Sequence, residues 1–307
     1  MPNAPTEQPS NLARRKLDFI YPFDFAPTGE FEIYPRDERG IPQVFYPHLQ
    51  RQVYNPITIA QYGLHQLSVF ARTNAAHAKA EALFMAEWLV EHLQAWRQEI
   101  HAWVFDFDLP FYGPQAPWIS ALAQGQGISL LLRACQAELH PSYEDACHRA
   151  VRAFYHSVEQ GGVTRSFPEG GLAFEEYPTR EPSLVLNGIL FALLGLHDYA
   201  AYFTDARAQA CFEAGVRGVK KNLLRYDTGY WNLYDLHRSR RLASPMYVEI
   251  HVRLFQTFAN MLQDDDLALV AEKWYGYLHS PFCRARFYGG KVAEKVRLHF
   301  TDYSASH

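Results

Sequence analysis

A strict alternation of short and long joins between helical stretches is the feature that most limits the fold of this chain. Apolar residues recur at helical spacing, and we expect helices at about 57–72, 75–100, 118–139, 142–158, 182–203, 204–224, 246–261 and 267–278. Short joins link these helices in pairs, whereas long aromatic and polar connections link the pairs at roughly 101–117, 161–181 and 226–245. In an antiparallel array, joins of one kind lie at the same end, so the long connections should meet on one face.

The sequence therefore predicts a mainly α fold, an incomplete or closed α/α barrel (toroid) of about four antiparallel helix pairs. Strand-like alternation in the long connections, as at 229–236, predicts short β insertions there. A functional site is expected at the long-loop end of the helices. A plain α-solenoid would use the same pairs, but it would show a regular sequence period, and none is clear.

The residues before these helices are aromatic and rich in proline. The stretches FEIY (31–34) and QVFY (43–46) flank a polar turn and predict a β-hairpin. Pro35 and Pro42 restrict it to an edge or an arm, which could contact a second copy of the chain. We expect an N-terminal arm at 1–53, a helical domain at 54–280 and a C-terminal extension at 281–307, either a tail or a short hairpin over Gly289 and Gly290.

Composition limits the partners of this protein. Hydrophobic residues make up 48% of the chain, which suffices for a large core, and the net charge of −4 is spread along it. No general attraction to nucleic acid follows, so an anionic substrate would need a local basic cluster. The four cysteines are scattered, and no metal or disulfide spacing is visible. Neither a signal peptide nor an apolar stretch of membrane-spanning length is present, which predicts a cytoplasmic protein.

The long connections place carboxylates beside tyrosines at the predicted face. Glu175, Glu176 and Tyr177 run into the apolar helix expected from Pro182, and further candidates follow at Tyr226, Asp227, Tyr234, Asp235, Tyr247, Glu249 and His251. Such pairs suit proton transfer, because burial raises the pKa of a carboxyl and a nearby cation lowers that of a phenol. Each tyrosine could equally be a packing residue, and Glu175 and Asp235 are expected to cap the chain or pair with arginines. No glycine-rich phosphate loop or serine elbow supports nucleotide or nucleophilic chemistry.

Several stretches stand out as a set of motifs: ITIAQYGL (57–64), APWISALAQGQGIS (116–129), EEYP with SLVLNG (175–188), YDTG with LYDL (226–236) and the segment from Tyr247 to His251. Together they resemble the heparan sulfate and heparosan D-glucuronyl C5-epimerases. The resemblance runs in order from about residue 54 to Leu278, and this succession of motifs is highly specific.

The resemblance implies an α/α-barrel catalytic domain that converts D-glucuronic acid to L-iduronic acid within a heparosan-like or N-sulfated polysaccharide, without a cofactor or a metal. It implies an anionic polysaccharide partner and a homodimer. It assigns catalysis to Glu176, Tyr177, Tyr234 and Tyr247, and we expect substrate binding by Gln124, Arg180, Asn187, His237, Arg238 and His251. Inversion needs proton-transfer groups on opposite faces of the sugar, and we expect Glu176 on one face and Tyr247 on the other. Tyr177 and Tyr234 would donate hydrogen bonds to the developing charge.

One position departs from the pattern of that family. Its members carry an arginine directly after the YDL triplet, whereas this chain has His237, followed by Arg238, Arg240 and Arg241. Either Arg238 or a neighbour supplies the fork that binds a carboxylate, or the sugar beside the uronate differs. Rival hypotheses are a polysaccharide lyase, a uronyl hydrolase that uses Glu176 and Asp235 as its carboxyl pair, and a non-catalytic glycan-binding protein.

Overall fold

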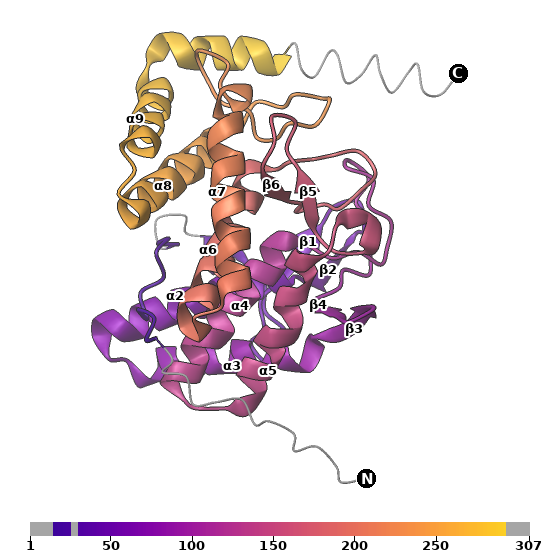
Figure 1. The fold of residues 1–307 in the computed structure, drawn as a ribbon. Helices are drawn as coiled ribbons and strands as arrows, with labels where there is room; N and C mark the ends of the chain where they lie inside the picture. Colours follow the sequence, from indigo (N-terminus) through magenta and orange to yellow (C-terminus); the bar gives the residue numbers. More distant parts are fainter. Residues whose placement is uncertain (1–14, 26–29, 293–307) are drawn as a thin grey trace.

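Four successive helix pairs make up most of the structure, a computed structural model that describes residues 15–25 and 30–292. The pairs are α2 (Pro56–Thr73) with α3 (Ala76–His92), α4 (Ala121–Ala137) with α5 (Pro141–Ala150), α6 (Leu186–Phe203) with α7 (Ala206–Tyr226), and α8 (Pro245–Leu262) with α9 (Asp265–His279) (Figure 1). Short helices add α1 (Glu30–Ile33), the 3-10 turns Val151–Tyr155 and Val158–Gln160, and a last helical segment at 281–292. The mainly helical fold predicted from the sequence is confirmed.

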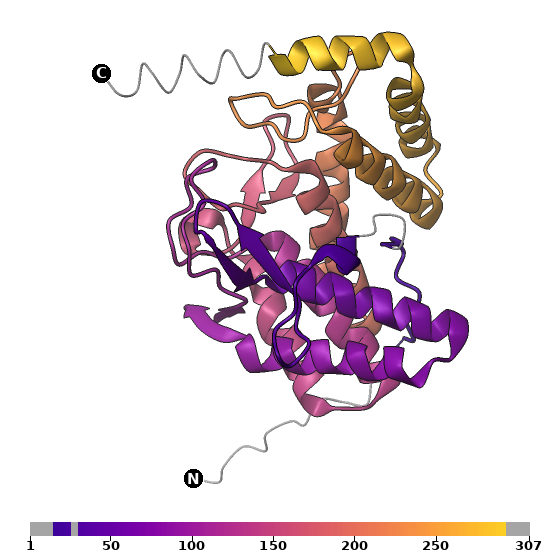
Figure 2. The ribbon, with the colours of Figure 1, turned by 180° about the vertical axis from the view of Figure 1, so that it is seen from behind.

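The first helices of the pairs lie side by side in chain order, with α4 and α6 at the centre. Helix α2 packs on α4, α4 on α6 and α6 on α8, while each second helix packs on its own partner (Figures 1 and 2). Almost every residue of α4 and α6 is buried. Gly125 and Gly195 permit this packing, because a Cβ at Gly125 would lie 2.7 Å from Cα of Ala192 and one at Gly195 would overlap the backbone of Gly125.

The first two long connections contain or adjoin short β insertions, whereas the third, where 229–236 was expected to be strand-like, has only isolated bridges. Strand β3 (Gln94–Arg97) pairs with β4 (Ile100–Ala102), and β5 (Thr164–Ser166) pairs with β6 (Leu172–Phe174), both antiparallel. The helix expected to reach residue 100 therefore ends at His92. Trp96 explains the change, because its indole N–H donates to the carbonyl of Gly161 at 2.8 Å and holds this hairpin against the second long connection.

The arm contains a hairpin in a different register from the predicted one. QVFY forms β1 (Gln43–Tyr46), but its partner is β2 (Arg51–Tyr54), while FEIY lies mostly in α1. Only a single bridge, between Arg36 and Pro42, joins the flanks of the polar turn. Pro42 lacks the N–H that a longer ladder would need, and the Phe31 ring instead packs on Tyr62 of α2 with 5.6 Å between ring centroids.

Three helix boundaries also differ from the expected ones. Helix α6 begins at Leu186 rather than at Pro182, because the N–H groups before it bind Glu175. Thr204 ends α6 in the left-handed conformation, and Asp205 caps α7 instead. The fourth helix begins at Pro141, with His140 rather than Ser142 in the cap position. Residues 281–292 are helical rather than a hairpin, and residues 293–307 lie outside the described part of the chain.

Residues 15–25 cross all the first helices of the pairs. The N–H of Leu17 donates to Gln136 of α4 at 2.6 Å, and the N–H of Tyr21 donates to Ser68 of α2 at 3.1 Å. Phe23 packs edge-on against Phe191 of α6 at 5.0 Å, and Thr257 of α8 donates to the carbonyl of Pro22 at 3.1 Å. Within the described residues, no helix has both the length and the apolar character that crossing a bilayer requires.

The close approach of α4 and α6 predicts opposite effects for two glycine substitutions. Gly195→Ala should lower the free energy of unfolding by about 3 kcal/mol, because the added methyl group overlaps backbone that cannot rotate away. Gly276→Ala, in α9, meets open space and should raise it by about 0.5–1 kcal/mol through helix propensity. Urea unfolding of both variants measures the difference, and similar values would contradict this packing.

Candidate active site

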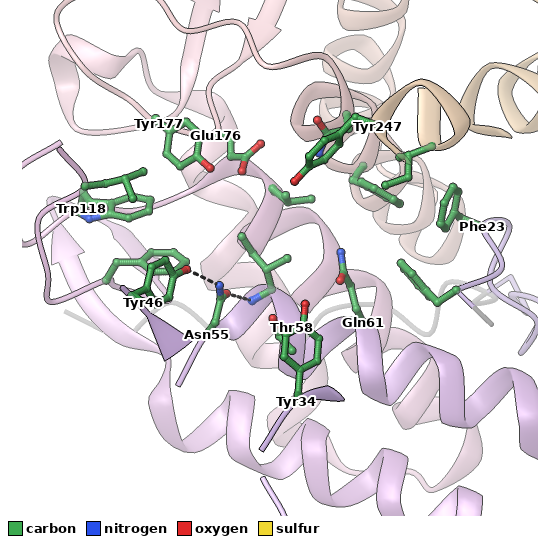
Figure 3. Close-up of a pocket in the computed structure, with 18 residues that line it drawn as sticks. Phe23, Tyr34, Tyr46, Asn55, Thr58, Gln61, Trp118, Glu176, Tyr177 and Tyr247 are labelled. Carbon is green, nitrogen blue, oxygen red and sulfur yellow. Dashed lines mark hydrogen bonds between the residues drawn. The ribbon is translucent and has the colours of Figure 1, made fainter. Parts of the chain in front are cut away.

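A cavity of about 230 Å³ lies where the first turns of α2, α6 and α8 meet the long connections (Figure 3). Helix α2 contributes Thr58 and Gln61, and its cap residue Asn55 lines the same wall. The arm contributes Phe23, Phe25, Tyr34 and Tyr46. The remaining walls come from Phe105, Leu109, Trp118, Glu176, Tyr177, Asn187 and Tyr247, among others. The arm is thus part of the wall of this site.

A second cavity of about 380 Å³ adjoins the first, because Leu109, Tyr177 and Tyr247 line both. Its other lining residues include Phe111, Tyr112, Tyr234, Arg241, Leu242 and Lys291. All three long connections contribute residues to these two cavities. The expected convergence of these connections on one region of the molecule is therefore observed.

Glu175 anchors the connection that carries the central carboxylate. Its carboxylate accepts hydrogen bonds from the Ser183 hydroxyl at 2.6 Å and from the Leu184 N–H at 3.0 Å, and it pairs with Arg165 at 3.1 Å. Its carbonyl accepts the first N–H of α4, from Ala121, at 3.0 Å. Glu175 therefore fixes the backbone on both sides of the next residue, and its pairing with arginine is as expected.

Glu176 is also buried, but its carboxylate is much less well satisfied. Its Oε2 has no hydrogen-bond partner among the described residues, and the side chain lies against Gly188 in the first turn of α6. A Cβ at position 188 would lie 2.5 Å from Oε2, so only glycine admits the carboxylate here. Burial and the neighbouring charges of Glu175 and Asp235 raise the pKa of Glu176 to about 7, despite a hydrogen bond from Tyr177 that lowers it. Near neutral pH this carboxyl can therefore both accept and release a proton.

The tyrosines around Glu176 are packed in pairs. Tyr177 stacks on Tyr112 with 4.4 Å between ring centroids, and Tyr234 meets Tyr247 edge-on at 4.5 Å. Burial, followed by the charge of Glu176, raises the pKa of both Tyr177 and Tyr234 well above the usual value. Figure 3 shows Tyr177 beside Glu176 and Tyr247 across from it, with their polar ends toward the space between them.

Arg241 supplies a cation to the second cavity. Asp235, fully buried, holds its guanidinium through Nε at 3.0 Å and a terminal nitrogen at 2.8 Å, and also accepts from the Tyr112 hydroxyl at 2.6 Å. The guanidinium carbon lies 4.0 Å from the centre of the Phe111 ring and 4.9 Å from that of Tyr234. Because Asp235 is occupied in this way, its carboxylate is a positioning group for Arg241 rather than a partner for Glu176 across a substrate.

Arg238 and His237 of the same loop lie elsewhere. Arg238 is exposed and pairs with Glu181 at 3.2 Å, and His237 approaches the same carboxylate at 3.7 Å. Neither residue lines the first or the second cavity. Arg241 lines the second cavity together with Tyr234 and Tyr247, whereas His237 meets the Tyr112 ring, at 5.7 Å between ring centroids.

The remaining candidates for substrate binding occupy different surroundings. Asn187 lines the first cavity, and its buried Oδ1 has no partner among the described residues. Gln124 is buried between elements, where it donates to the carbonyls of His101 and Ala150. His251 is buried beside Trp274, lines neither cavity, and has its pKa lowered to about 3 by burial. Arg180 lines a third cavity, described below.

The sequence pattern did not identify several of the residues that line the two cavities. Tyr46 reaches the cavity only because β1 pairs with β2, and its hydroxyl accepts from the amide of Asn55 at 2.9 Å. Tyr112 and Phe111 belong to a connection whose aromatic content gave no indication of which rings face the site. Asn55 before Pro56 was a recognisable helix cap, and it does cap α2. Within the described part of the chain, no three His, Cys, Asp or Glu side chains are grouped as metal ligands.

Comparisons with a family model and with a curated relative agree on one family. The family model described as D-glucuronyl C5-epimerase C-terminus matches residues 97–276. A D-glucuronyl C5-epimerase of Caenorhabditis elegans is 36% identical over 179 residues, which are 53% of this chain and 29% of that protein. An uncharacterized protein of Methanocaldococcus jannaschii is 27% identical over 204 residues, 62% of this chain and 65% of that protein. The chain thus spans less than two thirds of the length of each relative.

A solved structure of a UGL variant with dGlcA-Glc-Rha-Glc is similar in fold. The TM-score is 0.50 at 16% sequence identity, over 72% of this chain and 61% of that one. At this level of identity the similarity concerns the fold alone.

The raised pKa of Glu176 predicts a pH-dependent loss of stability. Folding raises the pKa of this carboxyl from 4.5 to about 7, so the stability it contributes is complete below 4.5 and is lost as the pH rises through 7. Near pH 8, the free energy of unfolding of Glu176→Gln should therefore exceed that of the wild type by about 3 kcal/mol, and its unfolding temperature should be higher. Near pH 4 the substitution should give no such gain.

Thermal unfolding at both pH values measures this difference. Glu272→Gln, on the exposed side of α9, is the matched control and should not change the pH dependence. If Glu176→Gln increased the stability at neither pH, burial of the ionised Glu176 carboxylate would not destabilise the folded protein.

Proposed function

This chain belongs to the D-glucuronyl C5-epimerase C-terminus family, and we propose that it is an isomerase that inverts C5 of D-glucuronate within a polysaccharide, giving L-iduronate. The polymer we propose is heparosan or its N-sulfated form. One observation carries the proposal. A buried carboxyl with a pKa of about 7 faces a tyrosine across a cavity; the carboxyl lies against the first turn of α6, and the tyrosine belongs to the first turn of α8.

The proton transfers follow from this arrangement. C5 of the uronate lies next to its carboxylate, so a base that removes the C5 proton leaves an electron pair delocalised into that carboxylate. Ionised Glu176 accepts this proton and becomes a carboxylic acid. Tyr247 donates its hydroxyl proton to the opposite face of C5 and becomes a phenolate, after which the C5 configuration is inverted. Exchange with solvent restores both groups, and the reverse reaction uses them in the opposite roles.

The developing negative charge requires stabilisation in this buried place. The hydroxyl of Tyr234 can donate to the enolate-like oxygens, and that of Tyr177 can do so once Glu176 has taken up the C5 proton, because their raised pKa values keep both protonated. Asn187, whose Oδ1 has no partner among the described residues, can accept from a sugar hydroxyl. Arg241 provides the positive charge beside Tyr234 and Tyr247 that lowers the cost of a phenolate.

We propose that the helix pairs form an incomplete α/α barrel with this cleft at one end. The order of packing from α2 to α8 and the similarity in fold to the UGL variant support the proposal. The homodimer and the cytoplasmic location implied earlier stay predictions. A hydrolase that pairs Glu176 with Asp235 is disfavoured, because Asp235 already binds Arg241 and Tyr112.

Proton NMR of heparosan and N-sulfoheparosan, each incubated with the protein in D2O, tests the reaction. We expect deuterium at C5 of the uronate and growing iduronate signals, without new reducing ends. Glu176→Gln and Tyr247→Phe should each reduce exchange by about 10³-fold or more while binding stays within a few-fold, because each removes a proton-transfer group and little shape. In wild type, kcat/KM should rise as the pH increases through about 7, where Glu176 ionises.

The control is Glu272→Gln, which should exchange at the wild-type rate. Chain cleavage with a new double bond would instead identify a lyase, and new reducing ends a hydrolase. Binding of both polymers without any exchange would identify a non-catalytic glycan-binding protein.

We further propose that Arg241 binds the uronate carboxylate in place of an arginine at position 237. Its guanidinium is held in place by Asp235 and lies among aromatic rings, and Arg241 lines the second cavity together with Tyr234 and Tyr247. Arg238 points to Glu181 instead.

Arg241→Lys and Arg238→Lys form a matched pair that tests this assignment. Lysine keeps the charge but loses the two-pronged hydrogen bonding, so Arg241→Lys should lower kcat/KM by about 10–100-fold. Arg238→Lys should change it by less than about two-fold, since that side chain is exposed. Steady-state C5 exchange measures both, and a larger effect at Arg238 would refute the assignment.

A further inference from the structure

A third cavity, of about 290 Å³, adjoins the first cavity at Trp118, whose side chain lines both. It is bounded by the β3–β4 hairpin, the end of the first long connection and the chain just after Tyr177. Its lining residues include Trp96, Arg97, Gln115, Pro178, Thr179 and Arg180. A polymer bound over Glu176 would thus have this third cavity beside it.

This third cavity is basic although the chain as a whole is acidic. Arg97 and Arg180 line it, and none of its lining residues is an aspartate or glutamate. Three acidic residues on the neighbouring segments are paired with other cations, Glu99 with Arg152, Glu159 with Arg165 and Glu181 with Arg238, whereas Asp108 accepts from the Ala116 N–H at 2.8 Å. None of these four carboxylates forms an ion pair with Arg97 or Arg180.

Neither arginine has an ion pair within residues 15–25 and 30–292. The guanidinium of Arg97 lies 5.3 Å from the centre of the Trp96 ring, and a Cβ at Gly161 would lie 2.6 Å from its Cδ. The stem of Arg97 is thus packed on a fixed wall, because Trp96 is itself hydrogen-bonded to Gly161. Arg180 approaches from the other side, three residues after Tyr177 in the chain.

We propose that this third cavity is an anion subsite, in which Arg97 and Arg180 bind a charged group of the polysaccharide on a sugar near the one that is epimerised. The inference rests on the proposed function, because it assumes that the polymer occupies the first cavity. Guanidinium groups recognise carboxylates and sulfates through the same paired N–H donors. The ligand is therefore the carboxylate of a neighbouring uronate or the N-sulfate of a neighbouring glucosamine.

The test uses the full chain with the double substitution Arg97→Gln and Arg180→Gln. Calorimetry with octasaccharides of heparosan and of N-sulfoheparosan measures affinity, and C5 exchange in D2O measures turnover. We expect the double variant to bind about ten-fold more weakly at low salt, to lose less at high salt, and to keep the wild-type kcat. Arg217→Gln, an exposed arginine of α7 paired with Glu213, removes the same kind of charge elsewhere and should change neither quantity.

The two octasaccharides distinguish the sources of the anion. Equal losses of affinity for both identify the carboxylate, which both polymers carry, whereas a loss confined to the N-sulfated one identifies the sulfate. Melting temperatures within about 2 °C of wild type show that the double variant is folded. Placing lysine instead of glutamine at position 180 should recover part of the affinity that the double variant loses.

Failure of the subsite and failure of the proposed function give different results. If wild type exchanges C5 but the double variant binds both octasaccharides as tightly as wild type, the subsite is refuted and the epimerase proposal stands. If wild type neither binds nor exchanges either polymer, the proposed function is refuted and the subsite with it.

Discussion

The buried carboxylate of Glu175 is the contact on which the arrangement of the site depends. Two oxygens bring together an arginine, a serine hydroxyl and the N–H groups before α6, while the carbonyl of the same residue accepts from the first turn of α4. The two central helices are therefore tied at one end through a single residue. Helix starts carry N–H groups that need partners, and Glu175 provides one at α4, whereas the Leu186 N–H at the start of α6 donates to the carbonyl of Tyr234 at 3.1 Å.

The next residue, Glu176, shows the opposite electrostatic arrangement. Glu175 faces its donors, whereas Glu176, at a bend just after β6, lines the first cavity. Donors and a cation compensate Glu175 for its burial, but Tyr177 alone does so for Glu176, which leaves one oxygen without a partner among the described residues. Burial thus raises the pKa of both carboxyls, and Glu176 is the less compensated of the two.

The sequence predicted the helix pairs and the meeting of the long connections, because both follow from apolar spacing and loop length. It failed where tertiary contacts decide local structure. The α6 start moved from Pro182 because Glu175 binds the preceding N–H groups, and Phe31–Ile33 became helical because Phe31 packs on α2. Glu176, Tyr177, Asn187 and Tyr247 line the first cavity, and all were candidates from the resemblance. Tyr46 and Arg241 depended on strand register and side-chain direction, which the pattern does not fix.

The segment at 15–25 limits the order in which the protein can fold. Its partners lie on α2, α4, α6 and α8, and the contact from Thr257 to Pro22 joins residues 235 positions apart. Contacts of such long sequence separation form late, since a large loop must close before they contribute. The wall formed by Phe23 and Phe25 can therefore be completed only after α8 has been synthesised. During translation the nascent chain would hold its helix pairs before it held a closed site, so binding of polymer begins only when the whole domain has emerged.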